Sequence, residues 1–164
     1  MKWATAAVII SSAWLAASPA SAATTTNCLP THIKPAKGRE ITFRLEIAST
    51  PQARATGLMN REHISPCDGM AFFFPSVDNT QPQFKIQKFW MKNTRIPLDI
   101  LFIDKKNRIS AIAHGVPQSL TPIGPDIPSA TVIEIDAGRA AKEGIRVGDI
   151  VHYELATHPY MLAD

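Results

Sequence analysis

Apolar and polar residues alternate along several parts of the chain, a pattern typical of β-strands with one face in water. The clearest case runs from Ile41 to Ile47, where every second residue is a large apolar one. Further strands are predicted at 108–114, 131–136 and 150–155. The continuous apolar run at 70–74 also has strand length, and we expect it to be fully buried.

Two short helices are predicted between these strands. The first covers 51–62 and begins with a proline, whose missing N–H does no harm there, after Ser49 or Thr50 as the N-cap. Gly57 weakens this helix. The second covers 137–143 and is closed by the glycine that follows. Six or seven strands with two short helices predict a β-rich (α+β) fold, a compact antiparallel β sandwich or small barrel.

The segment 89–104 is predicted to form a central β-hairpin. Residues 89–93 and 98–104 are rich in aromatic and branched side chains. The connection between them contains Pro97, which cannot donate a hydrogen bond to a central ladder. Both faces of this hairpin would be mostly apolar, so we expect it to lie inside the domain.

The predicted register of this hairpin makes Lys92 and Asp99 cross-strand neighbours, with Trp90 on the same face. A buried charge needs a partner, and a neighbour at roughly 5 Å is a suitable one. The two residues are therefore either an ion pair that fixes the register, or the polar floor of an apolar ligand pocket beside Trp90.

Four further residues are candidates for ligand contacts. Arg54 and Arg61 lie on one side of the first predicted helix, where they could hold an anion or pair with acidic residues at the surface. His114 ends a predicted strand, and it is either a core or edge histidine or a base that converges on Asp99. Asn93 is expected to hydrogen-bond within the turn.

Three classes of function stay open. The chain lacks the GxSxG and HExxH motifs and any phosphate-binding glycine loop. We expect no cofactor and no metal, although Met59, Met70 and Met91 could bind Cu(I) as well as fill gaps in the core. The remaining classes are a binder of a small molecule or glycan, a module that binds a periplasmic protein, and a hydrolase-type enzyme that uses His114 or Asp99.

Residues 1–22 have the pattern of a secretory signal peptide, with a charged start, a short apolar run and small residues before a cleavage site after Ala22. Cleavage would shorten the chain from 164 to 142 residues and lower its net charge from +3 to +2, since Lys2 is the only charged residue removed. We expect a periplasmic or secreted protein without a membrane span. Its weak, scattered positive charge does not favour nucleic acid as a partner.

Export would permit a disulfide bond, and two cysteines follow the predicted cleavage site, Cys28 and Cys67. The alternative is a pair of metal-binding thiolates, but neither residue has a histidine or cysteine at a zinc-like spacing. The expected organisation is an N-terminal arm at 23–39 held by Cys28, one globular domain at 40–158 and a C-terminal tail at 159–164.

Several short motifs stand out in the predicted domain. The most specific are the sequences WMKNT at 90–94 and PLDI at 97–100. Others include Arg54 with Gly57-Leu58-Met59 and Arg61, Gly69-Met70, Glu134, Gly138, Gly144 and Gly148-Asp149. On these residues the chain resembles domain-of-unknown-function family 192, small bacterial and archaeal proteins that are often exported. The resemblance covers roughly 41–155 and implies a β-rich domain, but it brings no established activity.

Overall fold

The computed structural model describes residues 28–74 and 84–155. The predicted signal peptide at 1–22 and the predicted tail at 159–164 lie outside these residues. The elements are β1 (Leu29–Lys34), β2 (Ile41–Ala48), α1 (Pro51–Thr56), β3 (Gly69–Phe73), β4 (Lys85–Ile86), β5 (Leu98–Ile103), β6 (Ile109–Gly115), β7 (Pro128–Ser129), β8 (Thr131–Asp136), α2 (Arg139–Glu143) and β9 (Ile150–Tyr153).

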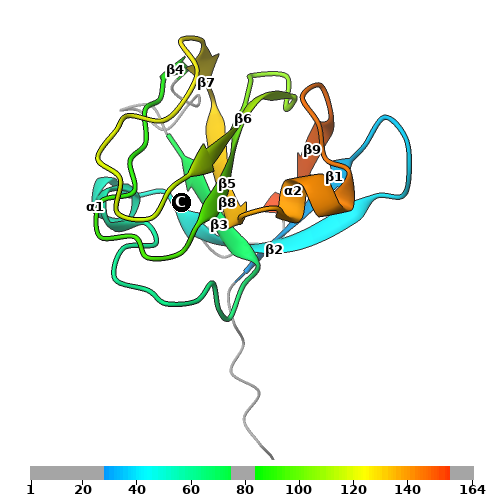
Figure 1. Cartoon of the computed structure of the whole chain (residues 1–164). Coiled ribbons are helices and arrows are strands. Elements are labelled where there is room, and N and C mark those ends of the chain that lie inside the picture. The colour runs from blue at the N-terminus through cyan, green and yellow to red at the C-terminus, as the bar shows by residue number, and fades with distance from the viewer. Residues whose placement is uncertain (1–27, 75–83, 156–164) are drawn as a thin grey trace, which may run out of the picture.

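Seven strands form one curled sheet in the order β6-β5-β8-β3-β2-β1-β9, which has the shape of a half-barrel (Figure 1). Strands β4 and β7 form a small second sheet. The predicted β-rich fold with two short helices is confirmed. In the large sheet β2 and β3 are parallel to each other, whereas all other pairs of neighbouring strands are antiparallel. This pairing is possible because the connection between the two strands is long and contains α1.

The two edges of the curled sheet meet at one end. Arg108, just before β6, forms an isolated bridge with Ile150 of β9. The N–H of Ile109 donates to the carbonyl of Asp149 at 2.9 Å. These contacts satisfy backbone groups that an open sheet edge would leave exposed.

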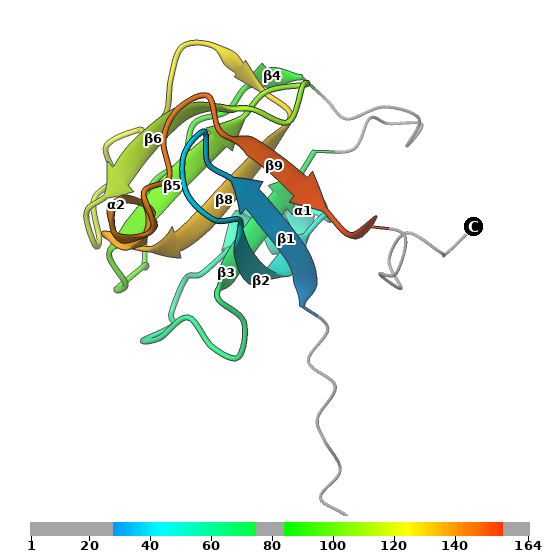
Figure 2. The ribbon, with the colours of Figure 1, turned by 90° about the vertical axis from the view of Figure 1, so that its right-hand side faces the viewer.

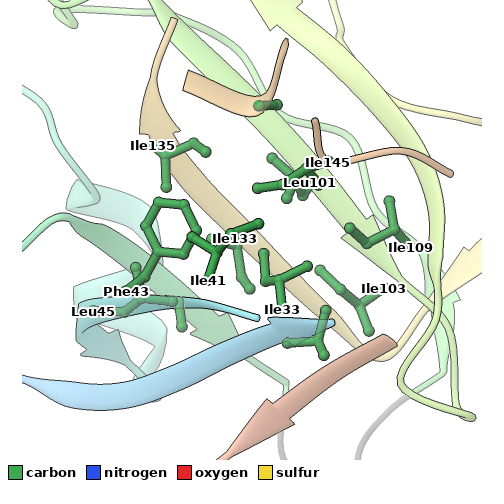
Figure 3. Close-up of a cluster of buried hydrophobic side chains, with 13 residues drawn as sticks. Ile33, Ile41, Phe43, Leu45, Leu101, Ile103, Ile109, Ile133, Ile135 and Ile145 are labelled. Atoms are coloured by element: carbon green, nitrogen blue, oxygen red, sulfur yellow. The ribbon is translucent and has the colours of Figure 1, made fainter. Parts of the chain in front are cut away.

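The curled strands enclose the first of two apolar clusters (Figure 3). Every strand of the large sheet supplies at least one side chain, and α2 with the residues after it closes one end. The labelled members are Ile33, Ile41, Phe43, Leu45, Leu101, Ile103, Ile109, Ile133, Ile135 and Ile145. The alternation at 41–47 predicted this arrangement, since buried and exposed residues alternate along the first half of β2.

A second apolar cluster lies on the opposite face of β3, β5 and β8. Its members are Ala48, Leu58, Met70, Phe72, Met91, Ile96, Leu98, Ile100, Phe102 and Val132. Successive side chains of a strand point to opposite faces, so Leu101 joins the first cluster and Phe102 the second. All six residues of β5 are buried, and so are the first five of β8. These two strands therefore lie between two packed layers.

The predicted hairpin at 89–104 is wrong. Its second half forms β5, but β5 pairs with β6 on one side and with β8 on the other. Both edges of β5 are thus occupied, so residues 89–93 cannot pair with it. They lie in a connection instead, where Phe89 forms an isolated bridge with Ile123.

The N-terminal arm predicted at 23–39 is also revised. Residues 29–34 form β1, which lies between β2 and β9 in the sheet (Figure 2). Pro30 weakened the strand signal, because proline removes a donor from the ladder. The structure places Cys28 and Cys67 at disulfide-bonding distance with Cα atoms 5.9 Å apart, as predicted. This bond ties the start of β1 to the segment that leads into β3.

The first helix is shorter than predicted. The side chain of Thr50 accepts a hydrogen bond from the N–H of Ala53, as expected of an N-cap. The helix ends at Thr56, because Gly57 takes a backbone φ of 48°, which leaves the helical region. Arg54 therefore lies on α1, whereas Arg61 lies beyond it.

Candidate functional site

A cavity of about 210 Å³ opens beside Trp90, next to the second apolar cluster. Four parts of the chain form its wall: α1 with the turn after it, β3 with Phe74, the connection at 87–94, and β8. Trp90 is 51% exposed, so the indole contacts both solvent and the cavity. The pocket predicted from the sequence had Lys92 and Asp99 as its floor, and neither of these residues lines this cavity.

Among the residues that the structure describes, Glu134 of β8 is the one acidic residue in the wall of this cavity. It is 4% exposed, and its neighbours across the sheet are Met70 and Ile100. Burial raises the pKa of its carboxyl to about 8, because desolvation disfavours the charged form. Within the described part of the chain the carboxyl has neither a hydrogen bond nor an ion pair. At neutral pH Glu134 is thus mainly a protonated acid beside the cavity.

Arg54 contributes to the same wall, but its guanidinium group donates hydrogen bonds to backbone carbonyls. Its Nη1 donates to the backbone carbonyls of Ser49 and Phe73, the latter at 3.1 Å. Its guanidinium carbon lies 5.5 Å from the centre of the Phe74 ring. Arg54 therefore fixes the end of β3 against α1 and lends the cavity a polar margin.

Lys88 also reaches the cavity wall and is also engaged by other groups. Its Nζ donates to the carbonyl of Gly124 at 2.7 Å and to the carboxylate of Asp126 at 2.9 Å. This side chain links the segment before Trp90 to the connection between β6 and β7. It therefore helps to hold one side of the cavity.

Aromatic rings make up much of the remaining wall. The rings of Phe72 and Phe89 meet edge to face with their centres 5.0 Å apart. Beyond Trp90 lies a second hollow of about 260 Å³, lined by Leu120 and Pro122 as well as by the tryptophan. Trp90 thus lines both recesses. Lys92 is exposed, with its Nζ 5.3 Å from the centre of the indole ring.

Asp99 and His114 form a separate pair. They face each other on β5 and β6, and Nδ1 of the imidazole lies 2.8 Å from Oδ1 of the carboxylate. The other carboxylate oxygen accepts the N–H of Ala140 in α2 at 2.9 Å. Asp99 is wholly buried, whereas the His114 side chain is 75% exposed. Because Nδ1 is held by the carboxylate, Nε2 is the ring nitrogen that this contact leaves unoccupied.

The structure does not bring the seven predicted site residues together in one place. Trp90 and Arg54 line the cavity, while Asp99 meets His114 outside it. The predicted contact between Lys92 and Asp99 is wrong, because Lys92 lies in a turn and Asp99 pairs across β6.

The last two predicted site residues hold the fold instead. Arg61 forms an ion pair with Glu46, with Nη2 and Oε2 2.8 Å apart, and this hydrogen bond raises the pKa of the arginine. Asn93 has a φ of 53°, and its carbonyl accepts the N–H of Asn60 at 2.8 Å. Neither residue lines the cavity.

Glu134 is the cavity residue that sequence reasoning missed. Its signal is present, since it is the single charged residue inside the run TVIEI at 131–135. An isolated acid in a strand buried on both faces has to be neutral, paired or facing a ligand. That inference requires knowing that both faces of β8 are covered.

The described residues lack both an arrangement for a metal ion and a helix that could span a membrane. No group of three or more His, Cys, Asp or Glu residues in 28–74 and 84–155 is arranged to hold a metal ion. In the same ranges no helix has the length and apolar character needed to cross a membrane.

Comparison with known proteins places the chain in a family. No curated protein is significantly similar to it. A crystal structure of a Sinorhizobium meliloti 1021 protein, provisionally described as a transcription regulator, is 33% identical with a TM-score of 0.69, covering 76% of this chain and 92% of that one. A protein of unknown function from Novosphingobium aromaticivorans DSM 12444 is 35% identical with a TM-score of 0.67, covering 84% and 94%. The model of the family described as "Uncharacterized ACR" matches residues 32–153, so this chain belongs to domain-of-unknown-function family 192, as the sequence motifs indicated.

Proposed function

We propose that the protein binds a small ligand in the cavity beside Trp90, with Glu134 as the polar group that the ligand meets. The observation that carries this proposal is a buried carboxyl in the cavity wall that has no partner among the described residues. A glutamate buried without a partner costs stability, and an apolar residue of similar size would avoid that cost. Perturbed ionisable groups in an otherwise apolar recess are typical of binding sites.

The shape of the recess supports the same proposal. A water molecule occupies roughly 30 Å³ in the liquid, so a cavity of about 210 Å³ has room for a ligand of several non-hydrogen atoms. Phe72 and Phe89 offer apolar walls, and the half-exposed Trp90 stands at the mouth. Sugars and aromatic compounds both stack on such rings.

A thermal-shift screen tests this proposal directly. Monosaccharides, small carboxylates and amines are added to the wild-type protein and to three variants, Trp90→Ala, Glu134→Gln and Val147→Ala. Val147 is an exposed apolar residue outside the cavity wall, so its variant is the matched control. We expect at least one compound to raise the Tm of the wild type and the control but not of the cavity variants. Equal shifts in all four proteins, or none in any, would count against a site beside Trp90.

The pair of Asp99 and His114 supports a second candidate function, general acid–base catalysis in a hydrolase-type reaction. A buried carboxylate that orients an exposed imidazole through Nδ1 leaves Nε2 to exchange protons with water or substrate. The test is hydrolysis of a panel of chromogenic esters by the wild type, His114→Gln and Asp99→Asn. Activity that both substitutions abolish would support this function, and activity that survives in His114→Gln would exclude it.

We further infer that the protein is exported and cleaved after Ala22. The signal-like pattern at 1–22 and the cysteine pair at disulfide distance support export. The measurement is the mass and N-terminal sequence of the protein recovered from a periplasmic extract. Full-length protein retained in the cytoplasm with two free thiols would contradict the proposal.

A further inference from the structure

The charge distribution of the cavity narrows the class of ligand, and this step rests on the binding role proposed above. We infer that the cavity takes a protonated primary amine, whose ammonium group reaches Glu134 and whose apolar body lies among the rings of Phe72, Phe89 and Trp90. The ligand would thus be an organic cation with a hydrophobic body about the size of a benzyl group.

The first argument is the balance of unpaired groups. Of the residues in 28–74 and 84–155, three with charged side chains line the cavity: Arg54, Lys88 and Glu134. Lys88 is bound to Asp126 at 2.9 Å, and Nη1 of Arg54 is shared by two backbone carbonyls. Glu134 alone has no partner among the residues that the structure describes. An entering ammonium group therefore finds an acceptor that no described residue engages, whereas a carboxylate would meet Lys88 and Nη1 of Arg54 already bound to other groups.

The second argument is the character of the wall. Electron-rich ring faces attract cations, and an ammonium group near an aromatic ring gains from this attraction when water is excluded. Lys92 and Arg54 already make such contacts with Trp90 and Phe74. The carboxylate of Glu134 would add a charge-assisted hydrogen bond, which is roughly twice as strong as one between neutral groups.

The third argument is the size of the space. At roughly 30 Å³ for a water molecule, about 210 Å³ corresponds to roughly seven water molecules. Benzylammonium has a similar number of non-hydrogen atoms, and its ring matches the apolar wall. Larger bodies could extend past Trp90 into the hollow lined by Leu120 and Pro122.

Proton release gives this inference a specific signature. Without ligand the pKa of Glu134 is raised to about 8, so the carboxyl is mainly protonated at neutral pH. An ammonium ion favours the carboxylate form, so binding would expel the proton. Arg54 from α1 and Lys88 from the segment before Trp90 are the other ionisable groups in the wall, and neither is paired with Glu134. The affinity for the cation should then rise with pH and level off above about 8.

Calorimetric titration with three compounds of matched shape provides the test. Benzylammonium, benzyl alcohol and benzoate are titrated into the wild type, Glu134→Gln and Glu62→Gln at several values between about pH 6 and about pH 8. Glu62 is an exposed acid paired with Arg95 and lies outside the cavity wall, so it is the matched control. The glutamine in Glu134→Gln is neutral, like the protonated glutamate that it replaces, so this variant should fold, and its melting curve verifies that.

We expect the affinity of the wild type and Glu62→Gln for benzylammonium to rise about tenfold per pH unit near pH 6 and less steeply near pH 8, with release of close to one proton at the lower pH and about half a proton at the upper one. Glu134→Gln should lose at least tenfold in affinity for benzylammonium and show no proton release. Benzyl alcohol should bind weakly and without this dependence on pH. Comparing butylammonium with Nα-acetyl-lysine amide then distinguishes a free amine from a lysine side chain as the natural source of the group.

The two proposals fail in different ways. Tighter binding of benzoate or benzyl alcohol than of benzylammonium, lost in Trp90→Ala, would overturn the amine inference and leave the binding function in place. If none of the three compounds binds, the amine inference fails, and the wider thermal-shift panel decides the binding function on its own.

Discussion

Asp99 and His114 face each other across β5 and β6, and the carboxylate that holds the imidazole is wholly buried while the imidazole itself is exposed. Asp99 also accepts the N–H of Ala140, so one side chain joins the sheet, the histidine and α2. The two partners therefore differ in what they contribute. Asp99 is part of the internal structure, and His114 is a surface group that this structure orients.

The first prediction follows from that asymmetry. Asp99→Ala should lower the free energy of unfolding by about 2 to 4 kcal/mol, because it leaves the N–H of Ala140 without an acceptor and creates a gap. His114→Gln should cost less than about 1 kcal/mol, since the histidine is largely exposed. Urea unfolding monitored by tryptophan fluorescence measures both values. Similar losses in the two variants would show that the histidine is also structural.

The second prediction concerns pH and stability. The pKa of Glu134 rises from an ordinary value of 4.5 to about 8 on folding, so the folded protein binds more protons than the unfolded chain between these values. The contribution of Glu134 to stability is fully present below about pH 4.5 and falls steadily as the pH approaches 8. Above that it is constant, and the accumulated loss is on the order of 5 kcal/mol.

Glu134→Gln isolates this effect from other titrating groups. As the pH rises from about 4.5 to about 8, the unfolding free energy of the wild type should fall relative to that of the variant. Denaturant unfolding at several pH values measures it. A difference that stays constant with pH would mean that the Glu134 carboxyl finds a partner or water in solution.

The sequence predicted those parts of the fold that depend on local pattern. The alternation at 41–47 gave β2, the run TVIEID gave β8, and the cysteine pair was identified by elimination. Prediction from the sequence failed where strands that are distant along the chain pair with each other. The register that places Asp99 opposite His114 depends on a shift in pairing between Phe102 and Ile103, and a hairpin around Pro97 satisfied the same apolar pattern.

The cavity could not be read from the sequence for a related reason. Its wall combines α1, β3, β8 and the connection at 87–94, which are distant along the chain. Trp90 was identified because it is rare and lies in an apolar setting. Glu134 looked like an ordinary strand acid until both faces of β8 were known to be buried.

The third prediction tests the assignment of Arg61 as a structural residue. Arg61 and Glu46 form a two-pronged ion pair, with both side chains partly buried. A double-mutant cycle with Arg61→Ala and Glu46→Ala should give a coupling of about 1 kcal/mol, measured by denaturant unfolding. Neither single variant should change the affinity for a ligand of the cavity. If Arg61→Ala lost affinity for a cavity ligand while its stability stayed unchanged, Arg61 would have to be assigned to the binding site.

The last prediction concerns Gly115, the last residue of β6, which packs against Met91 in the segment of Trp90. A Cβ atom at this glycine would lie 2.4 Å from the sulfur of Met91, a side chain that is wholly buried next to Trp90 in sequence. Gly115→Ala should therefore displace Met91, cost about 1 to 3 kcal/mol and shift the tryptophan emission. Met91→Ala alone should cost about 2 to 5 kcal/mol by leaving a cavity. In the double variant the added methyl group enters that cavity, so the combined loss in unfolding free energy should be smaller than the sum of the single losses. Additive losses with an unchanged emission spectrum would show that the two segments are not coupled through this contact.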